Sequence, residues 1–341
     1  MLIVRAPMRI SFVGGGTDLS DFYRHSPGRV ISSAIDKYVY VAINRPPLIR
    51  HVSARYSASE IVDHPSMLKN DRIREALLEL GILSNIEVGT FTDVFVNAGL
   101  GSSSSFAVAL MKGLYATLGK RIDRQEAAEA ACRLEIDLVK EPIGKQDQYA
   151  AAFGGFNVLQ FNPDGSVGVT PLRLDYKQRL NLESHVLVFF TGITRQAASV
   201  LQEQKEETHN KIATLKGLAD SVFEFRDRLL AGDLAGMGRM LHEGWLIKRT
   251  LASKVSNTAI DDMYNAGMGH GAWGGKVLGA GGGGCVMFLA PRETHSFIRQ
   301  ALADAAKKHA LDGFSEIPVR FVHSGVEVIT NRNSFDRKSA F

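Results

Sequence analysis

A short turn rich in glycine and serine constrains this chain more than any other feature. The turn, Asn97-Ala98-Gly99-Leu100-Gly101-Ser102-Ser103-Ser104-Ser105, follows β-branched and aromatic residues at 86–96 that predict a strand. After it, large apolar residues recur at every fourth position from 106 to 118, which predicts a helix. Glycine lets a backbone approach a ligand closely, and a helix start offers unpaired N–H groups to an anion. The turn therefore predicts a phosphate-binding loop, with a plain helix cap by Ser102 as the alternative.

Two better-known motifs do not explain these glycines. The turn lacks the lysine of a Walker A loop, and the chain has no Gly-x-Ser-x-Gly elbow of a serine hydrolase. A second cluster, Gly279-Ala280-Gly281-Gly282-Gly283-Gly284, does match the Gly-x-Gly-x-x-Gly of dinucleotide-binding folds. Those folds need a helix directly after the glycines, whereas Cys285-Val286-Met287-Phe288-Leu289 predicts a buried strand. An NAD-dependent oxidoreductase is therefore only a remote alternative.

Two carboxylates, Glu135 and Asp147, lie on apolar faces of predicted helices. A carboxylate on an inward-facing stripe is costly unless it meets a cation. Internal salt bridges would satisfy both groups. Since the two follow a phosphate loop, a metal ligand and a base for phosphoryl transfer are the functional interpretation. The residues three and four positions away are Ala131, Cys132, Leu138 and Val139 for Glu135, and Ile143, Gly144, Ala150 and Ala151 for Asp147.

Two further polar residues stand near the first glycine cluster, at 14–16. Arg9 alternates with apolar residues on a predicted strand at 5–13, on the face that also carries Ser11. It is either a surface arginine or, beside Asp147, a group that stabilises charge on a transferring phosphoryl group. Asp18 follows the glycines, where it either caps the next segment or accepts hydrogen bonds from sugar hydroxyls.

Composition limits the setting and the partners. The net charge is +4, but the basic residues are spread along the chain, which favours a solvated surface over nucleic-acid binding. No apolar run reaches the roughly 20 residues of a membrane span, and the first residues do not predict an export signal. With two cysteines, a disulfide framework is not expected. We expect a cytoplasmic protein without nucleic-acid or membrane partners, and a homodimer is left open.

The second half of the chain predicts its own layer. The order is a strand at 185–190, helices from about residue 194 to 267, strands at 276–279 and 285–289, a helix at 293–310 and a strand at 317–322. This is the split βαβ order of a ferredoxin-like layer. The two halves have no linker of low complexity between them, so we expect them to share a cleft.

Three ordered motifs resemble the GHMP kinases, named for galactokinase, homoserine kinase, mevalonate kinase and phosphomevalonate kinase. The motifs are residues 6–18, 98–105 and 276–285, and through their order the resemblance covers almost the whole chain. The resemblance implies an α+β GHMP kinase fold. An N-terminal half like ribosomal protein S5 domain 2, residues 1–180, would bind ATP and sugar, and residues 181–341 would form the ferredoxin-like half. It also implies ATP and Mg²⁺ as cofactors.

The resemblance also implies roles for individual residues. Residues 98–105 would bind ATP, with Ser103 and Glu135 as the Mg²⁺ ligands. Asp147 would be the catalytic aspartate, and Arg9 would lower the pKa of the attacking hydroxyl. The remaining positions are Gly15, Gly16, Thr17 and Asp18 for the sugar, and Gly281, Gly282 and Gly283 near the phosphates.

One departure from galactokinases bears on the acceptor. They carry Gly-Glu-His-Thr-Asp where this chain has Gly14-Gly15-Gly16-Thr17-Asp18, so two polar contacts to a hexose are missing. The triple-glycine form is similar to bacterial D-glycero-D-manno-heptose 7-phosphate kinases, which make heptose 1,7-bisphosphate for nucleotide-activated heptose. A fucose- or galactose-like sugar is the alternative. A sugar phosphate would need a distal anion site, for which Arg195, Lys248 and Arg249 are candidates unless they are solvated helix charges.

Overall fold

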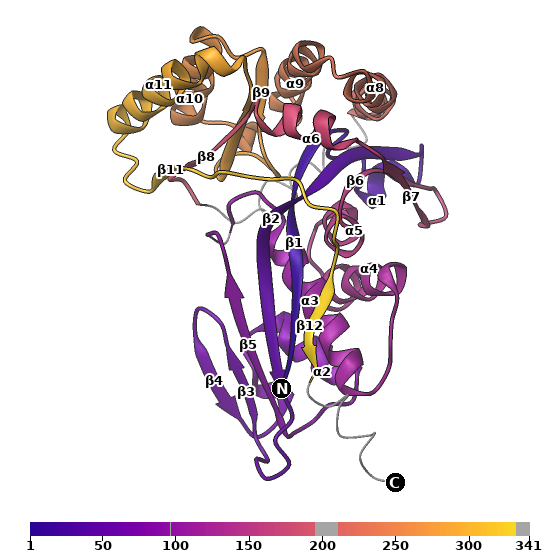
Figure 1. The fold of residues 1–341 in the computed structure, drawn as a ribbon. Coiled ribbons are helices and arrows are strands. Elements are labelled where there is room, and N and C mark those ends of the chain that lie inside the picture. The colour runs from indigo at the N-terminus through magenta and orange to yellow at the C-terminus, as the bar shows by residue number, and fades with distance from the viewer. Residues whose placement is uncertain (96, 195–210, 332–341) are drawn as a thin grey trace.

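The computed structural model describes residues 1–95, 97–194 and 211–331, and it forms two sheets with helices against each (Figure 1). The first sheet has the order β12-β1-β2-β5-β3-β4, with β6 pairing with β2 and β7 with β6. Its strands are β1 (Leu2–Val13), β2 (Gly28–Asn44), β3 (Val52–Arg55), β4 (Ser59–Val62), β5 (Ile86–Thr92), β6 (Phe156–Phe161), β7 (Val167–Leu172) and β12 (Glu327–Asn331). The α+β class predicted from the sequence is confirmed.

Helices pack against the first sheet and bury its apolar side chains in one core. They are α2 (Asp71–Glu79), α3 (Ser102–Thr117), α4 (Arg124–Cys132) and α5 (Gln146–Phe153), with the short α1 (Ser20–Tyr23) and the 3₁₀ turn η1 (Pro65–Met67). Helix α4 begins with the capping box of Asp123 and Glu126 and continues directly into a π-helical segment, η2 (Arg133–Leu138). Such π segments are rare and are often found at functional sites.

The second sheet has the all-antiparallel order β11-β8-β10-β9, as expected for the ferredoxin-like layer. Its strands are β8 (Val186–Thr191), β9 (Gly274–Val277), β10 (Cys285–Leu289) and β11 (Phe314–Glu316), and its helices are α8 (Ile212–Ala231), α9 (Leu234–Arg249), α10 (Thr258–Gly269) and α11 (His295–Lys308). Shorter elements are α6 (Tyr176–Glu183), η4 (Ser253–Val255) and η5 (Arg292–Thr294).

The last strand of this layer differs from the prediction. Strand β11 ends at Glu316, whereas the sequence predicts a strand at 317–322. Pro318 has no N–H to continue the ladder, so the pairing stops after Ile317 donates to the carbonyl of Val188. Farther on, β12 returns to pair with β1 in the first sheet. The predicted start of the helix near residue 194 falls partly outside the described residues.

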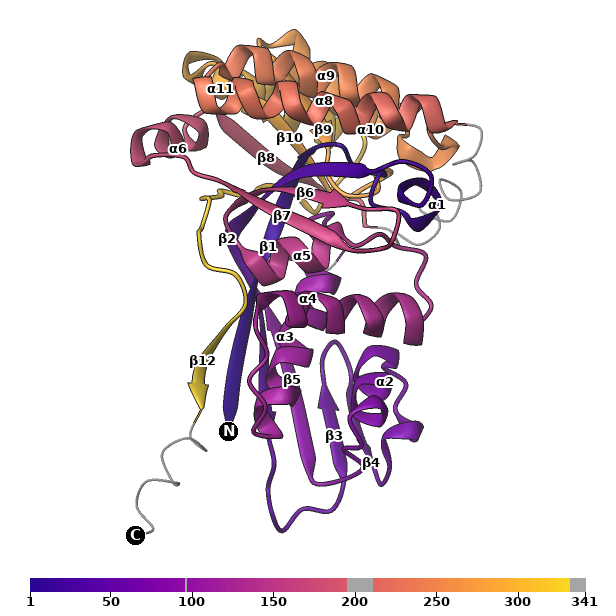
Figure 2. The ribbon, with the colours of Figure 1, turned by 90° about the vertical axis from the view of Figure 1, so that its right-hand side faces the viewer.

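The two layers are joined by a shared core and by close backbone contacts. Strands β1 and β2 are long enough to run from the first layer up beneath the helices of the second (Figures 1 and 2). Met8, Ile10 and Phe12 of β1 pack in the same core as residues of α8, α9 and β10. The N–H of Cys285 donates to the carbonyl of Ala98 at 2.9 Å. The second and third motifs therefore meet at one place. Among the described helices, none has the length and apolarity to span a membrane.

Candidate active site

A cleft of about 440 Å³ lies where the two layers meet. It is bounded by β1, by the starts of α3 and α5, and by the turn between β9 and β10. Residues of all three predicted motifs line it, among them Arg9, Ser103 and Gly283. The fold therefore brings the three motifs together as the sequence predicts.

The serine loop forms one wall of this cleft. Gly101 adopts a left-handed conformation at φ 78°, and α3 begins directly after it at Ser102. The first backbone bond of the helix runs from the N–H of Ser105 to the carbonyl of Gly101 at 3.0 Å. The N–H groups of Ser102, Ser103 and Ser104 precede this bond, and all three residues line the cleft. The wall therefore presents donors and the positive end of a helix to an anion.

Other residues of the loop hold it in place. Ala98 and Leu100 are buried in the core shared by the two layers. The hydroxyl of Ser105 donates to the carbonyls of Pro7 at 2.9 Å and Gly101 at 3.0 Å. These three residues therefore lie behind the cleft, while Gly99 lines it.

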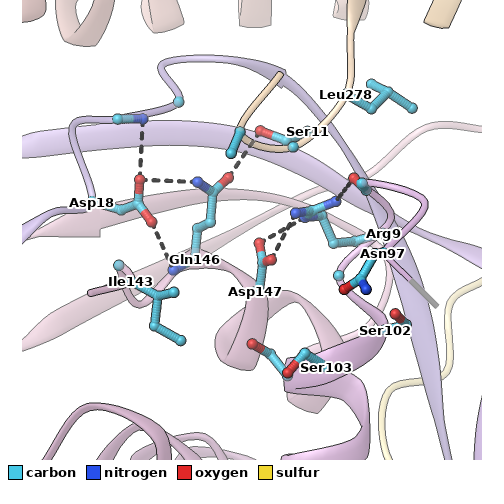
Figure 3. A pocket seen from close by; sticks show the side chains of 18 of the residues that line it. Arg9, Ser11, Asp18, Asn97, Ser102, Ser103, Ile143, Gln146, Asp147 and Leu278 are labelled. Carbon is cyan, nitrogen blue, oxygen red and sulfur yellow. Dashed lines mark hydrogen bonds and ion pairs between the residues drawn. The ribbon is translucent and has the colours of Figure 1, made fainter. Parts of the chain in front are cut away.

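Arg9 reaches the cleft from an irregularity in β1. The register between β1 and β2 shifts between Pro7 and Arg9, and the N–H of Arg9 donates to the carbonyl of Leu100 at 2.9 Å. Its guanidinium forms a bidentate ion pair with Asp147, in which Nε donates to Oδ1 at 2.7 Å and Nη2 donates to Oδ2 at 2.7 Å (Figure 3). Nη1 donates to the carbonyl of Gly99 at 2.7 Å. Arg9 thus ties Asp147, at the start of α5, to the serine loop.

Glu135 lies fully buried on η2 with three donors around it. Ser103 Oγ and Arg72 Nε each lie 3.0 Å from its Oε1, and Gln148 Nε2 lies 2.7 Å from its Oε2. Arg72 also reaches Glu141 at 3.2 Å. The internal salt bridges that the sequence offers as the structural alternative are present, with Arg72 paired to Glu135 and Arg9 paired to Asp147.

The surroundings of Glu135 suit a magnesium ion. The hydroxyl of Ser103 and the carboxylate of Glu135 are adjacent hard oxygen donors, which Mg²⁺ prefers. Mg²⁺ commonly takes only one or two protein ligands and completes its shell with water and substrate phosphates. Ser103 lines the cleft, whereas Glu135 lies behind it, and the described residues hold no group of three or more His, Cys, Asp or Glu placed to bind a metal.

Asp18 belongs to a hydrogen-bonded chain on the other side of the cleft (Figure 3). Gln146 Nε2 donates to Asp18 Oδ1 at 2.9 Å, and Ser11 Oγ donates to Gln146 Oε1 at 2.9 Å. The backbone N–H groups of Gly16 and Gln146 donate to the same carboxylate at 3.2 and 3.3 Å. Burial raises the pKa of Asp18, and the nearby charge of Asp147 raises it further, while these hydrogen bonds lower it. Asp18 is therefore a buried acceptor held in one orientation.

The first glycine cluster contributes space to the cleft. Gly15 and Gly16 line it, and a side chain added at Gly15 would meet no atom within 4 Å. Thr17 points elsewhere: it is fully buried, its hydroxyl donates to the carbonyl of Gly14 at 2.8 Å, and it accepts from the N–H of Arg29 at 3.0 Å. Thr17 therefore shapes the turn from outside the cleft.

The second glycine cluster, at 279–284, lines the cleft at fewer of the predicted positions than expected. Gly283 lines it, whereas Gly281 and Gly282 do not. The cluster joins strands β9 and β10, so no helix follows it as a dinucleotide-binding fold would require. The expectation of a strand after these glycines is confirmed.

The three residues predicted to bind a distal anion differ in their position relative to the cleft. Lys248 lines the cleft and donates to the carbonyl of Gly279. Arg249 does not line it and pairs with Asp261 at 2.9 Å on the surface. Arg195 lies outside the described residues. Lys276, the first residue of the third motif, lines the cleft and is buried, although the sequence predicts no role for its side chain.

Comparison with known proteins decides the family. Residues 68–155 match the model of the GHMP kinases N terminal domain, and residues 225–308 match that of the GHMP kinases C terminal. The chain belongs to the GHMP kinases. It is an ATP-dependent kinase, since ATP is the phosphate donor of the family.

Several relatives of this kinase have been described. It is 26% identical over 313 residues to the D-glycero-alpha-D-manno-heptose 7-phosphate kinase of Campylobacter jejuni, covering 86% of this chain and 91% of that one. It is 25% identical over 340 residues to the galactokinase of Pyrococcus furiosus, covering 88% and 92%.

Solved structures show the same fold. A D-glycero-D-manno-heptose 1-phosphate kinase from Bacteriodes thetaiotaomicron superposes with a TM-score of 0.79 at 23% identity, over 97% of this chain and 99% of that one. The galactokinase of Lactococcus lactis complexed with galactose has a TM-score of 0.74 at 17% identity, over 96% and 94%.

Proposed function

We propose that this kinase transfers the γ-phosphoryl group of ATP to the anomeric hydroxyl of D-glycero-D-manno-heptose 7-phosphate. The products are ADP and heptose 1,7-bisphosphate, an intermediate for nucleotide-activated heptose. The two-point pair of Arg9 and Asp147, set between the serine loop and Asp18, is the observation that carries the proposal. It provides a base and a cation between a phosphate-binding wall and a carboxylate suited to sugar hydroxyls.

The chemistry assigned to this pair is an in-line displacement. The acceptor oxygen bonds to the γ-phosphorus while the bond from that phosphorus to the β–γ bridging oxygen breaks. The proton of the acceptor hydroxyl passes to a carboxylate oxygen of Asp147. Arg9 holds the Asp147 carboxylate in place through its two hydrogen bonds and balances the charge on the γ-phosphoryl oxygens.

The donor side is assigned to the serine loop. The phosphates of ATP accept hydrogen bonds from the N–H groups at the start of α3, which Ser102, Ser103 and Ser104 provide. Ser103 and Glu135 would hold Mg²⁺, which when bound supplies positive charge to the phosphate oxygens. Arg72 pairs with the same carboxylate oxygen of Glu135 that Ser103 contacts.

The acceptor side is assigned to the glycine turn and Asp18. Asp18 accepts hydrogen bonds from sugar hydroxyls, and Gly15 and Gly16 leave room for a sugar larger than a hexose. The similarity to the heptose 7-phosphate kinase over 86% of this chain supports the same acceptor. A fucose- or galactose-like sugar is the second candidate, because galactokinases are similar over 88% of the chain.

An ADP-release assay with a panel of acceptors tests the proposal. The panel contains heptose 7-phosphate, heptose 1-phosphate, unphosphorylated heptose, galactose, fucose and mevalonate. One heptose relative is described as a 7-phosphate kinase and the other as a 1-phosphate kinase, so the panel includes both heptose phosphates. We expect the highest kcat/KM with heptose 7-phosphate. A higher kcat/KM with galactose or fucose would show that the proposed acceptor is wrong, while the assignment as a kinase would still hold.

A further inference from the structure

A second, smaller cavity adjoins the cleft. It measures about 130 Å³ and lies between the end of β1 and the helices α8 and α9. Gly15, Lys248 and Lys276 line both cavities, so these three residues mark the junction between them. No residue of the serine loop lines the smaller cavity. The junction therefore adjoins the glycine turn at Gly15, and Lys248 there also donates to the carbonyl of Gly279 in the third motif.

Lys276 brings a buried amino group to this junction. It is 8% exposed, and its ammonium donates to the carbonyls of Ser11 at 2.9 Å and Phe12 at 2.8 Å. Among the described residues, no carboxylate forms an ion pair with it. Burial lowers its pKa well below the usual lysine value, and the charges of Lys248 and Arg9 lower it further. A buried ammonium in this setting is stabilised by an arriving anion.

The charged and polar groups around the smaller cavity indicate which part of it can bind an anion. Lys248, near the C-terminal end of α9, adds a second ammonium at the junction. The indole N–H of Trp245 lacks a hydrogen-bond partner among the described residues, and Trp245 lines the smaller cavity at 1% exposure. Glu224 and Glu243 also line that cavity but not the cleft, so they disfavour an anion deeper inside. Positive charge is thus concentrated at the junction itself.

We propose that Lys248 and Lys276 bind a phosphate monoester at the far end of the acceptor, at the junction of the two cavities. The inference rests on the proposed function, because it presumes an acceptor that carries phosphate away from its reacting hydroxyl. Lysine ammonium groups bind phosphate as compact point charges with several donors. The site would make the kinase select phosphorylated over neutral sugars.

The test compares Lys248→Met with a matched control on the same helix. Arg249→Met removes one positive charge at the next position, but Arg249 pairs with Asp261 outside both cavities. We measure KM for heptose 7-phosphate, for unphosphorylated heptose and for ATP, and inhibition by inorganic phosphate. Lys248→Met should raise KM for heptose 7-phosphate by on the order of tenfold to a hundredfold, as for loss of a bond to a charged group. Its KM for ATP and for neutral heptose, and all values for Arg249→Met, should stay near wild type.

Lys276→Arg serves as the second variant, because Lys276→Met could fail to fold. It keeps the charge but changes the donor geometry, and it should raise KM for heptose 7-phosphate more than KM for ATP. An increase confined to ATP would overturn the inference and place the lysines at the nucleotide.

Failure of the two proposals can be told apart. If both lysine variants turn over heptose 7-phosphate normally with unchanged KM, the phosphate subsite is wrong and the proposed function stands. Weaker phosphate inhibition of Lys248→Met, in a kinase that does not turn over heptose 7-phosphate, supports the subsite and removes the proposed acceptor. Turnover of neutral sugars only, insensitive to both lysines, removes both.

Discussion

The guanidinium of Arg9 and the carboxylate of Asp147 face each other in a two-point ion pair, with both N–O distances at 2.7 Å. The pair joins β1 of the first motif to the start of α5, which are 138 positions apart in the chain. Arg9 also contacts the carbonyl of Gly99 in the serine loop. The proposed base is therefore fixed relative to the phosphate-binding wall by one side chain.

Asp147→Asn should lower kcat by on the order of 10² or more, the scale of general-base loss. The amide cannot take the proton of the acceptor hydroxyl, and its NH₂ group would face the Arg9 guanidinium. The measurement is ADP release at saturating ATP and acceptor, with KM for ATP and circular dichroism as controls for folding. Turnover close to wild type in a folded variant would remove Asp147 from its proposed role.

Glu135→Gln should raise the Mg²⁺ concentration needed for half-maximal activity. The amide keeps the shape of the side chain but removes the negative charge that holds a divalent cation. The measurement is a Mg²⁺ titration at fixed ATP, together with the shift in melting temperature on adding Mg²⁺ and ADP without acceptor. An unchanged metal dependence in both would leave Glu135 with only a structural ion pair to Arg72.

Arg72→Gln should lower the free energy of unfolding by about 3 kcal/mol, the lower end for removing one partner of a buried ion pair. Glu135 is fully buried, whereas the Arg72 side chain is 23% exposed. Chemical denaturation measures the change. The double variant Arg72→Gln with Glu135→Gln is the control, and it should recover much of the loss because the unpaired charge is gone. An equal loss in the double variant would show that Arg72 stabilises through packing instead.

Asp18→Asn should change both acceptor binding and the pH dependence of stability. Since the pKa of Asp18 is raised in the folded protein, ionising it opposes folding, and wild-type stability falls as the pH rises from its unfolded to its folded pKa. The variant lacks this component, so its free energy of unfolding relative to wild type should increase with pH. Its KM for the acceptor should rise on the order of tenfold, because sugar hydroxyls would lose hydrogen bonds that they donate to a charged carboxylate.

Denaturation at several pH values and acceptor kinetics check these two effects separately. If the difference in free energy of unfolding between Asp18→Asn and wild type does not change with pH, the pKa of Asp18 is not raised. If the variant has the same KM for the acceptor as wild type, Asp18 does not bind the sugar, and the result for its pKa still holds.

Local patterns in the sequence predict the parts of the site that depend on local structure. The serine loop, the strand after the second glycine cluster and the need of Glu135 and Asp147 for cations all follow from periodicity and from the cost of buried charge. The ferredoxin-like order also follows from the alternation of elements, apart from the shorter last strand.

Long-range partners could not be predicted in the same way. Arg72 meets Glu135 across 63 positions, and nothing in its own spacing distinguishes it from a surface arginine. The burial of Lys276 follows from its contact with the carbonyls of Ser11 and Phe12, about 265 positions earlier in the chain, which its place in the third motif does not predict. Thr17 is predicted to bind the sugar from its place in the first motif. Its hydroxyl instead donates to the carbonyl of Gly14, a direction that the motif does not determine.

The most direct measurement of the central claim is the identity of the product made from ATP and heptose 7-phosphate. Mass spectrometry gives the number of phosphates, and phosphorus NMR shows which carbon bears the new one. We predict one ADP per acceptor and a bisphosphate whose new phosphorus couples to the anomeric proton. ADP release without a new sugar phosphate, or a new phosphate on a hydroxyl other than the anomeric one, would contradict the account.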